Sequence, residues 1–342
     1  MQLLLILSKK NAATLLLTLL ILSSSLCSCM TDGIYRTDEG AIWATQYHIK
    51  YKAPRQMTDS ILATLRHVEM SVSVFNDSSL VSRLNHCGSL TADSILAKVF
   101  NGSKEVNSLS NGAFDPTLGP LIELWGFGRN RSITQTPPDS LITKTLQYVG
   151  IAQCSIDSCG IIRKKHPLTQ FNFSAIAKGL ACDEVGLMMQ RNGITDYMIE
   201  IGGEVALSGN NERGEKWRLS VDAPLTDENN PAAHHRLTMI DVTDCGVATS
   251  GNYRNYHEVS GHTIGHTISP ATGRPVDKGC LSATVIAPDC MMADALATAC
   301  MAMQPDSAMV MIEGLPHTEV MMVLPGNPYR TVTSKGFPEL HH

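Results

Sequence analysis

Two oxygen-bearing side chains lie in an otherwise apolar segment of the chain, MMADALATACMAM, which contains Asp294 and Thr298. The segment consists of good helix formers, and Asp289 is the expected N-cap, so both side chains share one face inside a helix. A carboxylate among Met, Ala and Leu side chains is costly to bury unpaired. The pattern therefore indicates a hard cation such as Mg²⁺, which takes oxygen ligands. The alternatives are a surface Asp or one paired with a distant Lys.

A second candidate is Lys178 in the segment FNFSAIAKGLACD, residues 171–183. Small residues surround this lysine where a strand is expected to lead into a helix, so backbone groups could approach an anion closely. The ammonium would then act as a point charge for a phosphate. The glycine pattern of a Walker A loop is missing. The alternative is an ordinary helix start with a solvated lysine.

Two other regions are rich in turn residues. The segment 111–128, NGAFDPTLGPLIELWGFG, suits a planar ligand, or else it is a capped helix with core aromatics. The region 202–276 contains the Gly202-Gly203 pair, SGNYR and HTISP, all of which favour close backbone approach or polar loops. Its histidines show no HExxH spacing, and a single histidine is more often structural than catalytic.

Helices and strands must position these segments. Apolar periodicity and capping signals predict one helix capped by Thr58 or Asp59, one with Pro116 near its start and one capped by Asp139 or Ser140. Further helices are predicted over 91–109, 174–193 and 305–313. Strands are predicted at 41–53, 196–210, 216–224, 237–251, 265–270, 281–288 and 317–324. There is no regular alternation of strand and helix. We therefore predict an α+β fold, a single catalytic domain of mixed sheets packed against helices.

Composition excludes some classes of function. The chain has 342 residues, is 43% hydrophobic and carries a formal net charge of -5. That length allows a large core in one or two domains. The slight acidity and the absence of a basic stripe give no reason to expect nucleic acid. Aromatic residues make up only 5% of the chain, which disfavours a platform for stacking single strands.

The first 28 residues have the pattern of an export signal: Lys9 and Lys10, then an apolar run, then small residues. The segment LCSC is similar to a bacterial lipobox with Cys29 as the lipidated residue, and Cys27 fits less well. An uncleaved membrane anchor is the alternative. We expect a signal peptide over 1–28, a tether over 29–40, a catalytic domain over 41–335 and a tail over 336–342. The chain would be exported and lipid-anchored, facing the periplasm from the inner membrane.

Eight further cysteines follow Cys29. They form no CxxC pair, so the sequence does not indicate a structural zinc site. Cys154 and Cys159 are the nearest candidates for a local disulfide. Cysteines in apolar runs, such as Cys290 and Cys300, are expected to be buried thiols.

Seven segments in one order resemble a known family. They are SLVSRLN, NGAFDPTLGPLIELWGFG, FSAIAKGLACD, IEIGGEV, ATSGNYRNY, HTISPATGRPV and ADALATA. Together they resemble the FAD:protein FMN transferases, the ApbE family, over roughly residues 41–335. The resemblance implies an enzyme that uses Mg²⁺ to cleave the pyrophosphate of FAD. It would attach FMN to a Ser or Thr of an acceptor protein and release AMP.

The resemblance also implies roles for individual residues. The metal ligands would be Asp294, Thr298 and the backbone carbonyl of Ala175, and His266 would be a polar participant near the acceptor. A carboxylate near the metal is the alternative base. The residues implied to contact the flavin nucleotide are Trp43, Phe75, Ala113, Phe114, Asp115, Asn172, Lys178 and Ile268.

Three positions depart from the family pattern. Asn172 and Asn252 stand where Asp is common, and Trp43 stands where Met is frequent. Asn172 keeps the hydrogen-bonding capacity but loses a charge. None of the departures removes an implied metal ligand.

Two other functions fit the same residues. One is a Mg²⁺-dependent FAD pyrophosphatase, in which water replaces the acceptor hydroxyl. The other is a flavin-binding lipoprotein without turnover, which the Asp294 and Thr298 pair disfavours. The acceptors implied by the resemblance are membrane electron-transport subunits of sodium-pumping or Rnf-type complexes.

Overall fold

The computed structural model describes residues 33–129, 133, 135–224, 236–251, 256–259, 262–276 and 279–341. The predicted signal peptide, 1–28, and Cys29 lie outside these residues. Within them, no helix combines the length and apolar character needed to cross a membrane.

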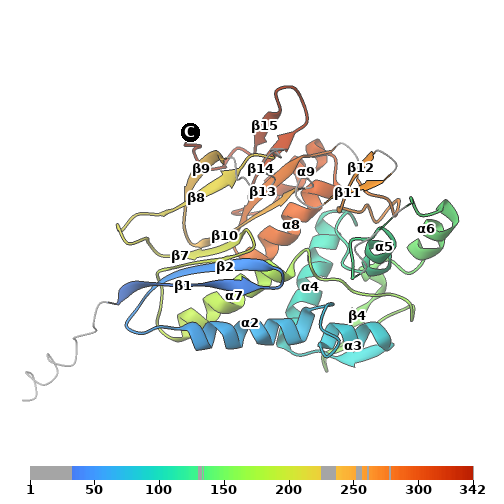
Figure 1. The fold of residues 1–342 in the computed structure, drawn as a ribbon, viewed down its shortest axis with the longest axis horizontal. Helices are drawn as coiled ribbons and strands as arrows, with labels where there is room; N and C mark the ends of the chain where they lie inside the picture. Colours follow the sequence, from blue (N-terminus) through green and yellow to red (C-terminus); the bar gives the residue numbers. More distant parts are fainter. Residues whose placement is uncertain are drawn as a thin grey trace, which may run out of the picture.

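A large antiparallel sheet forms the centre of the molecule, in the order β1-β2-β6-β7-β10-β13-β14-β15 (Figure 1). Strands β13 and β14 are buried along almost their whole length, because both of their faces are covered. The strands are β1 (Ile34–Ile42), β2 (Thr45–Ala53), β6 (Tyr197–Ile201), β7 (Glu204–Ser208), β10 (Cys245–Gly251), β13 (Ser282–Ala287), β14 (Glu319–Leu324) and β15 (Arg330–Thr333).

Helices cover one face of this sheet and build the main core with it. The most central is α8, which is apolar almost all round and packs against α7, β10 and β13. Figure 1 shows α2, α4 and α7 on the same side of the strands. The helices are α2 (Thr58–Val72), α3 (Leu80–His86), α4 (Ser94–Leu109), α5 (Gly119–Leu124), α6 (Asp139–Leu146), the 3₁₀ turn η1 (Ile151–Gln153), α7 (Ala177–Arg191), α8 (Cys290–Ala302) and α9 (Pro305–Glu313).

The opposite face carries a smaller core under a hairpin. Val205 and Leu207 of β7 point into this second core, while Ala206 points into the main one, as the two-residue period of a strand requires. The hairpin consists of β8 (Trp217–Asp222) and β9 (Arg236–Val242). There are two further small sheets among the described residues. One has the order β3 (Ser89–Thr91), β5 (Ile161–Arg163), β4 (Ser155–Ile156). The other pairs β11 (Tyr256–Val259) with β12 (His262–Gly265).

The predicted α+β class is confirmed, with helices gathered on one side of an antiparallel sheet. The expected tether ends earlier than predicted, because Ile34–Ile42 forms β1 and pairs with all of β2. The tail also packs: the side chains of Phe337 and Leu340 contact the second core. His341 exchanges two backbone hydrogen bonds with Met239, each 2.9 Å from N to O.

Several local predictions were wrong in detail. Helices α2 and α6 begin after Met57 and Pro138, and neither has a side-chain cap. Helix α5 begins at Gly119 with Pro120 in its first turn, because residues 116–117 form a turn instead. The strand predicted at 265–270 ends as β12 at Gly265, and only Ile268 beyond it makes a bridge, to Pro275. The cap at Asp289 is confirmed, since its side chain accepts from the Met292 N–H at 2.8 Å.

The predicted disulfide between Cys154 and Cys159 is absent: these two thiols and the six others in the part of the chain described are free. Cys154 is buried while Cys159 is exposed, so the two differ in environment. Cys290 and Cys300 are buried thiols, as expected.

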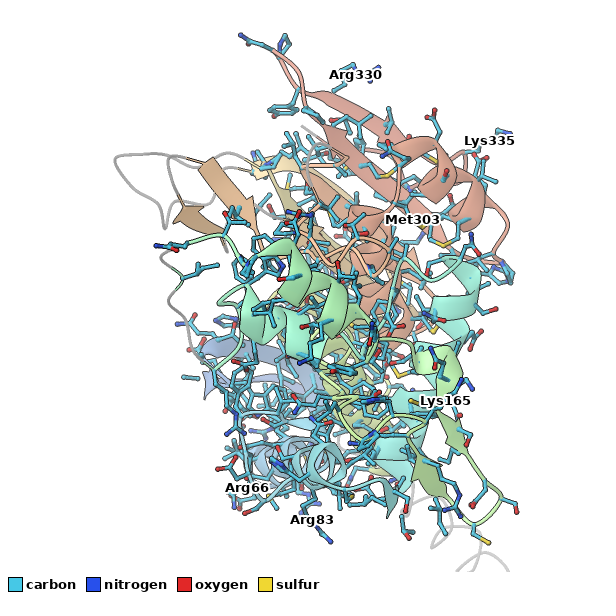
Figure 2. All side chains as sticks on the ribbon, turned by 90° about the vertical axis from the view of Figure 1, so that its right-hand side faces the viewer. Arg66, Arg83, Lys165, Met303, Arg330 and Lys335 are labelled. Atoms are coloured by element: carbon cyan, nitrogen blue, oxygen red, sulfur yellow. The ribbon has the colours of Figure 1, made fainter. Side chains whose placement is uncertain are left out.

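Exposed basic side chains lie at both ends of the molecule. Figure 2 shows Arg66 and Arg83 at one end and Arg330 and Lys335 at the other. These labelled residues therefore form no single basic face.

Candidate functional site

The amino end of α7 meets the middle of α8, which brings two of the predicted segments together. Asp294 on α8 is only 3% exposed. Its carboxylate oxygen Oδ2 accepts a hydrogen bond from the Gly179 N–H at 3.0 Å, and the Lys178 N–H also donates to it. A Cβ on Gly179 would lie 2.2 Å from the carbonyl oxygen of Cys290, so only glycine allows the helices to approach this closely. The first N–H groups of a helix thus hold a buried carboxylate.

Thr298 lies one turn after Asp294 on the same helix and is partly buried. Its Oγ1 is 3.2 Å from Oγ of Ser250, the penultimate residue of β10. Ser250 belongs to the SGNYR motif, but no local sequence pattern pairs it with Thr298. The site therefore presents a carboxylate and two hydroxyls from neighbouring elements.

Lys178 forms an ion pair with Glu204, the first residue of β7. The Lys178 side chain is 32% exposed and that of Glu204 only 4%. The lysine stem passes over the turn between β6 and β7, since a Cβ on Gly202 would lie 3.2 Å from Lys178 Cδ. Sequence reasoning missed Glu204. The available signal was a charged residue at the start of the apolar strand EVALS, directly after two glycines.

The three charged groups influence one another. Burial raises the pKa of Asp294 above its usual range, although the Lys178 ammonium and two backbone N–H groups oppose this. Burial also raises the pKa of Glu204, Lys178 lowers it, and Asp294 raises it further. Burial alone would lower the pKa of Lys178, but the two carboxylates outweigh it and raise that pKa. Two carboxylates therefore lie near one ammonium, which leaves negative charge that a proton or an added cation would compensate.

A tight turn leads into α7 and contains Asn172 and Ala175. The Asn172 Oδ1 accepts from the Ser174 N–H at 2.9 Å, which shapes the turn. The Asn172 N–H donates to the carbonyl of Pro116 at 2.7 Å. Ala175 lies in this turn, three residues before Lys178. Both predicted residues thus lie at the start of α7.

The predicted AFD segment packs beside this turn, but its side chains have internal roles. The Phe114 ring is 2% exposed and belongs to the main core. The Asp115 carboxylate accepts from the Thr117 N–H at 2.8 Å and the Ile151 N–H at 3.0 Å. Burial raises the pKa of Asp115, and these bonds oppose the rise. Of the three residues, Ala113 and the backbone of the segment remain suited to ligand contact.

Trp43 lies at the tip of the β1–β2 hairpin in an unusual backbone conformation. Trp43 and Ala44 have φ of 50° and 61°, values that glycine or asparagine adopts more readily. The Trp43 indole Nε1 is buried and has no hydrogen-bond partner among the described residues. A Cβ on Gly202 would lie 2.9 Å from Thr45 Oγ1, so the hairpin end adjoins the turn over which Lys178 passes. Such strain is common where a ligand is bound.

The remaining predicted residues, Ile268, His266 and Phe75, lie on loops outside the contact between α7 and α8. Ile268 is buried in a third, small core together with Trp125, whose Nε1 donates to the Gly273 carbonyl at 2.8 Å. The His266 ring packs edge-on against Phe127, with 6.2 Å between ring centroids. Phe75 is 55% exposed, in the loop after α2.

One contact joins these outer loops. Arg129, two residues after Phe127, donates to the Val74 carbonyl and pairs with Asp77 at 2.6 Å. It links the loop of Phe75 to the loop that contacts His266.

The residues present fit a Mg²⁺ ion. Asp294 supplies a buried carboxylate, Thr298 a hydroxyl on the same face, and Ala175 a carbonyl in the adjacent turn. Magnesium prefers such hard oxygen ligands and usually takes few from the protein. Among the described residues, no group of three His, Cys, Asp or Glu side chains could hold a metal ion, so the protein would offer a partial ligand set.

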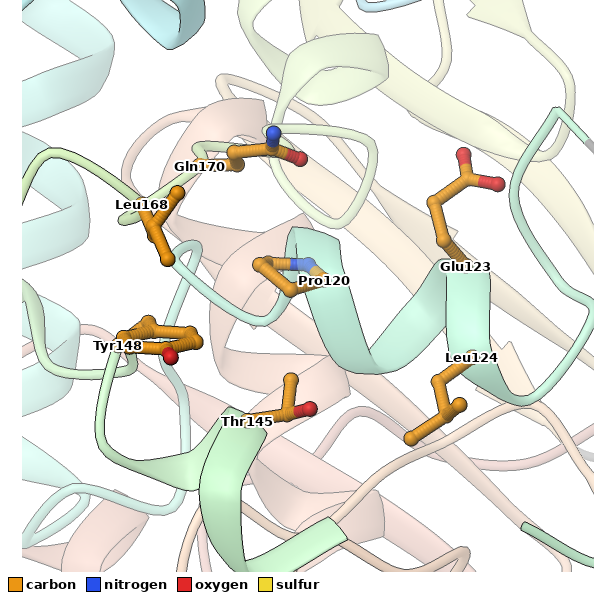
Figure 3. A pocket seen from close by; sticks show the side chains of 7 residues that line it. All are labelled: Pro120, Glu123, Leu124, Thr145, Tyr148, Leu168 and Gln170. Atoms are coloured by element: carbon orange, nitrogen blue, oxygen red, sulfur yellow. The ribbon is translucent and has the colours of Figure 1, made fainter. Parts of the chain in front are cut away.

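Two pockets lie away from these residues. The first, of about 410 Å³, lies beside α5 and α6, and Figure 3 shows its seven lining side chains, which include Pro120, Tyr148 and Leu168. The second, of about 360 Å³, lies between α7 and the start of α8 and is lined in part by Asp183 and Asp289. No sequence-predicted site residue lines either pocket.

A comparison with known protein families agrees with this fold. The model of the ApbE family matches residues 43–322. The chain belongs to the ApbE family, a family of transferases. It is 33% identical over 307 residues to an FAD:protein FMN transferase of Vibrio cholerae. The aligned region covers 87% of this chain and 90% of that relative.

Solved structures agree with this assignment. The flavin transferase ApbE from Vibrio cholerae superimposes with a TM-score of 0.79 at 30% identity, covering 89% of this chain and 98% of that one. The apo form of the flavinyl transferase ApbE from Pseudomonas stutzeri gives a TM-score of 0.77 at 26% identity, covering 90% of this chain and 96% of that one. The family resemblance inferred from the seven motifs is confirmed.

Proposed function

We propose that this protein transfers FMN from FAD to a serine or threonine hydroxyl of an acceptor protein, in a Mg²⁺-dependent reaction that releases AMP. The observation that carries the proposal is the meeting of Asp294 with the start of α7, beside Lys178, in a chain of this family. The acceptor oxygen forms a new bond to the FMN phosphorus. The pyrophosphate P–O bond breaks, and AMP leaves with the electron pair.

Asp294, Thr298 and the carbonyl of Ala175 would hold the metal. When bound there, Mg²⁺ neutralises negative charge on the pyrophosphate oxygens as the bond breaks. The partly exposed Lys178 ammonium adds a second positive charge that can face a phosphate oxygen. Positioning and charge would therefore supply most of the catalysis.

The outer residues would bind the nucleotide and the acceptor. The unpartnered Trp43 indole N–H offers a hydrogen bond, and the exposed Phe75 ring offers a stacking surface. Ala113, Asp115, Asn172 and Ile268 lie on the loops that would border the ligand, with Phe114 anchoring its loop in the core. His266 is the proposed acceptor of the hydroxyl proton.

We also propose that the protein works outside the cytoplasm, exported by the signal peptide and lipid-anchored at Cys29 to the inner membrane. The basis is the lipobox-like LCSC sequence, which lies outside the described residues. The anchor would keep the enzyme close to acceptors that are themselves membrane electron-transport subunits.

Asp294→Ala tests the function. Purified protein is incubated with FAD, Mg²⁺ and an acceptor peptide that contains a serine or threonine, and mass spectrometry detects the FMN adduct while chromatography measures AMP. We expect adduct and AMP with the unaltered chain, and loss of both by at least a hundredfold in the variant.

The matched control is Asp306→Ala, which removes an exposed carboxylate from the neighbouring helix α9 and should leave activity unchanged. Absence of any adduct from the unaltered chain would refute the transferase. Equal AMP release with and without the acceptor would instead establish hydrolysis of FAD.

A further inference from the structure

Glu204 is a buried acidic residue of the IEIGGEV segment, to which the family resemblance assigned no role. It begins β7 directly after the turn of Gly202 and Gly203, whose φ values of 65° and 105° are accessible mainly to glycine. The Glu204 side chain is 4% exposed and its charged partner is Lys178. A buried carboxylate of this kind is retained only if its charge is compensated.

The backbone of Glu204 is firmly held. Glu204 pairs with Ile201 in the β6–β7 hairpin, and its carbonyl accepts from the Cys182 thiol at 3.3 Å. Lys178 lies one turn before Cys182 on α7. Because strand and helix are both fixed, the carboxylate presents a stationary partner to a long, flexible lysine side chain.

Lys178 has a second possible partner. The Asp294 carboxylate accepts a hydrogen bond at 3.0 Å from the N–H of Gly179, the residue directly after Lys178, so its charge lies close to that lysine. Without Glu204, the ammonium would have Asp294 as its strongest remaining attraction. A lysine paired with Asp294 would compete with a metal for the same oxygens.

We propose that Glu204 is a positioning residue, which holds the Lys178 ammonium at β7 and thereby keeps the Asp294 carboxylate open to Mg²⁺. The inference rests on the proposed magnesium site. It assigns Glu204 no contact with the metal or with FAD. Its effect is indirect, through where Lys178 lies.

Isothermal titration calorimetry tests the inference: Mg²⁺ alone is titrated into the FAD-free protein, and its affinity is measured. Glu204→Gln should weaken Mg²⁺ binding about tenfold or more, the usual effect of removing a group that orients a ligand. Glu204→Asp keeps the negative charge but shortens the reach to Lys178, and should weaken binding similarly.

The matched control is Glu184→Gln, a change on the same helix as Lys178, which removes the ion-pair partner of Lys98 on α4. It should bind Mg²⁺ like the unaltered chain. Glu204→Asp with unaltered affinity would overturn the proposal, because a general effect of negative charge would then suffice. Unaltered affinity in Glu204→Gln would overturn it as well.

A double variant keeps the test valid if Glu204→Gln alone is too unstable to measure. Glu204→Gln combined with Lys178→Met leaves neither charge of the pair buried alone, and it should recover Mg²⁺ affinity because the competing ammonium is gone. No recovery would contradict the proposal. Asp294→Ala separates the two hypotheses: if it binds Mg²⁺ as well as the unaltered chain does, the metal site itself is wrong.

Discussion

At the scale of single residues, one carboxylate on α7 organises the start of α8. The two Asp183 oxygens accept from the N–H groups of Cys290 at 2.9 Å and Met291 at 2.8 Å. These are among the first N–H groups of a helix, which have no partner within it. Burial, with repulsion from Asp289, raises the pKa of Asp183 to about 7, against the lowering effect of the two N–H groups.

This raised pKa predicts a pH dependence of stability. The folded chain binds the Asp183 proton more tightly than the unfolded chain, where an aspartate has a pKa of about 3.9. The contribution of Asp183 to stability is therefore greatest at low pH and falls as pH rises from about 4 to about 7. The melting temperature of the unaltered chain, measured relative to that of Asp183→Asn, should fall across this window. A difference in melting temperature between the two proteins that does not change with pH would contradict this prediction.

At the scale of elements, α8 is pressed between α7 and the sheet. A Cβ on Gly246 of β10 would lie 2.3 Å from the Cys290 Cα, and a Cβ on Gly179 would lie 2.2 Å from the Cys290 oxygen. The first turn of α8 thus passes between two glycines. Its position, and with it that of Asp294, depends on there being no side chain at either place.

Gly179→Ala should therefore displace α8. We expect it to lower the free energy of unfolding by about 1–3 kcal/mol, as overpacking does, and to reduce Mg²⁺-dependent activity. Denaturant unfolding and the AMP assay measure the two effects. Gly88→Ala is the control, because a Cβ there would meet nothing within 4 Å. Equal stability of the two variants would refute the tight contact.

The small core around Trp125 gives a second prediction for an element. Trp125→Phe removes the buried hydrogen bond to Gly273, which is worth about 1 kcal/mol, and should loosen residues 266–276. Hydrogen exchange should rise in peptides from this segment but not from β13. The control is Trp217→Phe, which removes the bond to the Ser208 carbonyl on the other face. Unchanged exchange in 266–276 would contradict the prediction.

The sequence predicted long elements better than their ends. The helix over 305–313 and the capped start of α8 were predictable because periodicity and caps are local signals. The starts of α2 and α6 were not, since no side chain caps either helix. The role of Glu204 was not predicted because its partner, Lys178, lies on another element, and pairing between distant segments leaves no local pattern.

At the scale of the whole molecule, the sheet separates two cores with different roles. The main core carries α7 and α8, and therefore the candidate site. The second core lies on the opposite face, under the β8–β9 hairpin and the C-terminal segment. Damage to the second core should affect stability more than chemistry.

Removal of residues 336–342 tests this separation. The deletion exposes apolar surface of the second core and removes the two backbone bonds between His341 and Met239. The melting temperature should fall by a few degrees while activity at 25 °C is retained. Loss of activity without loss of stability would show that the two faces are coupled. Phe337→Ala, which leaves the backbone bonds in place, should give a smaller fall.

The position of α8 in the chain also governs when the site can exist. Lys178, Asp183 and Glu204 are all synthesised long before residues 290–302, yet each depends on α8 directly or through a neighbour. Contacts between segments so distant form slowly and late in folding. An unfinished chain would thus have the lysine and its glutamate, but no carboxylate from Asp294 to hold a metal. The proposed Mg²⁺ site can therefore form only after residues 290–302 have been synthesised and have packed against α7.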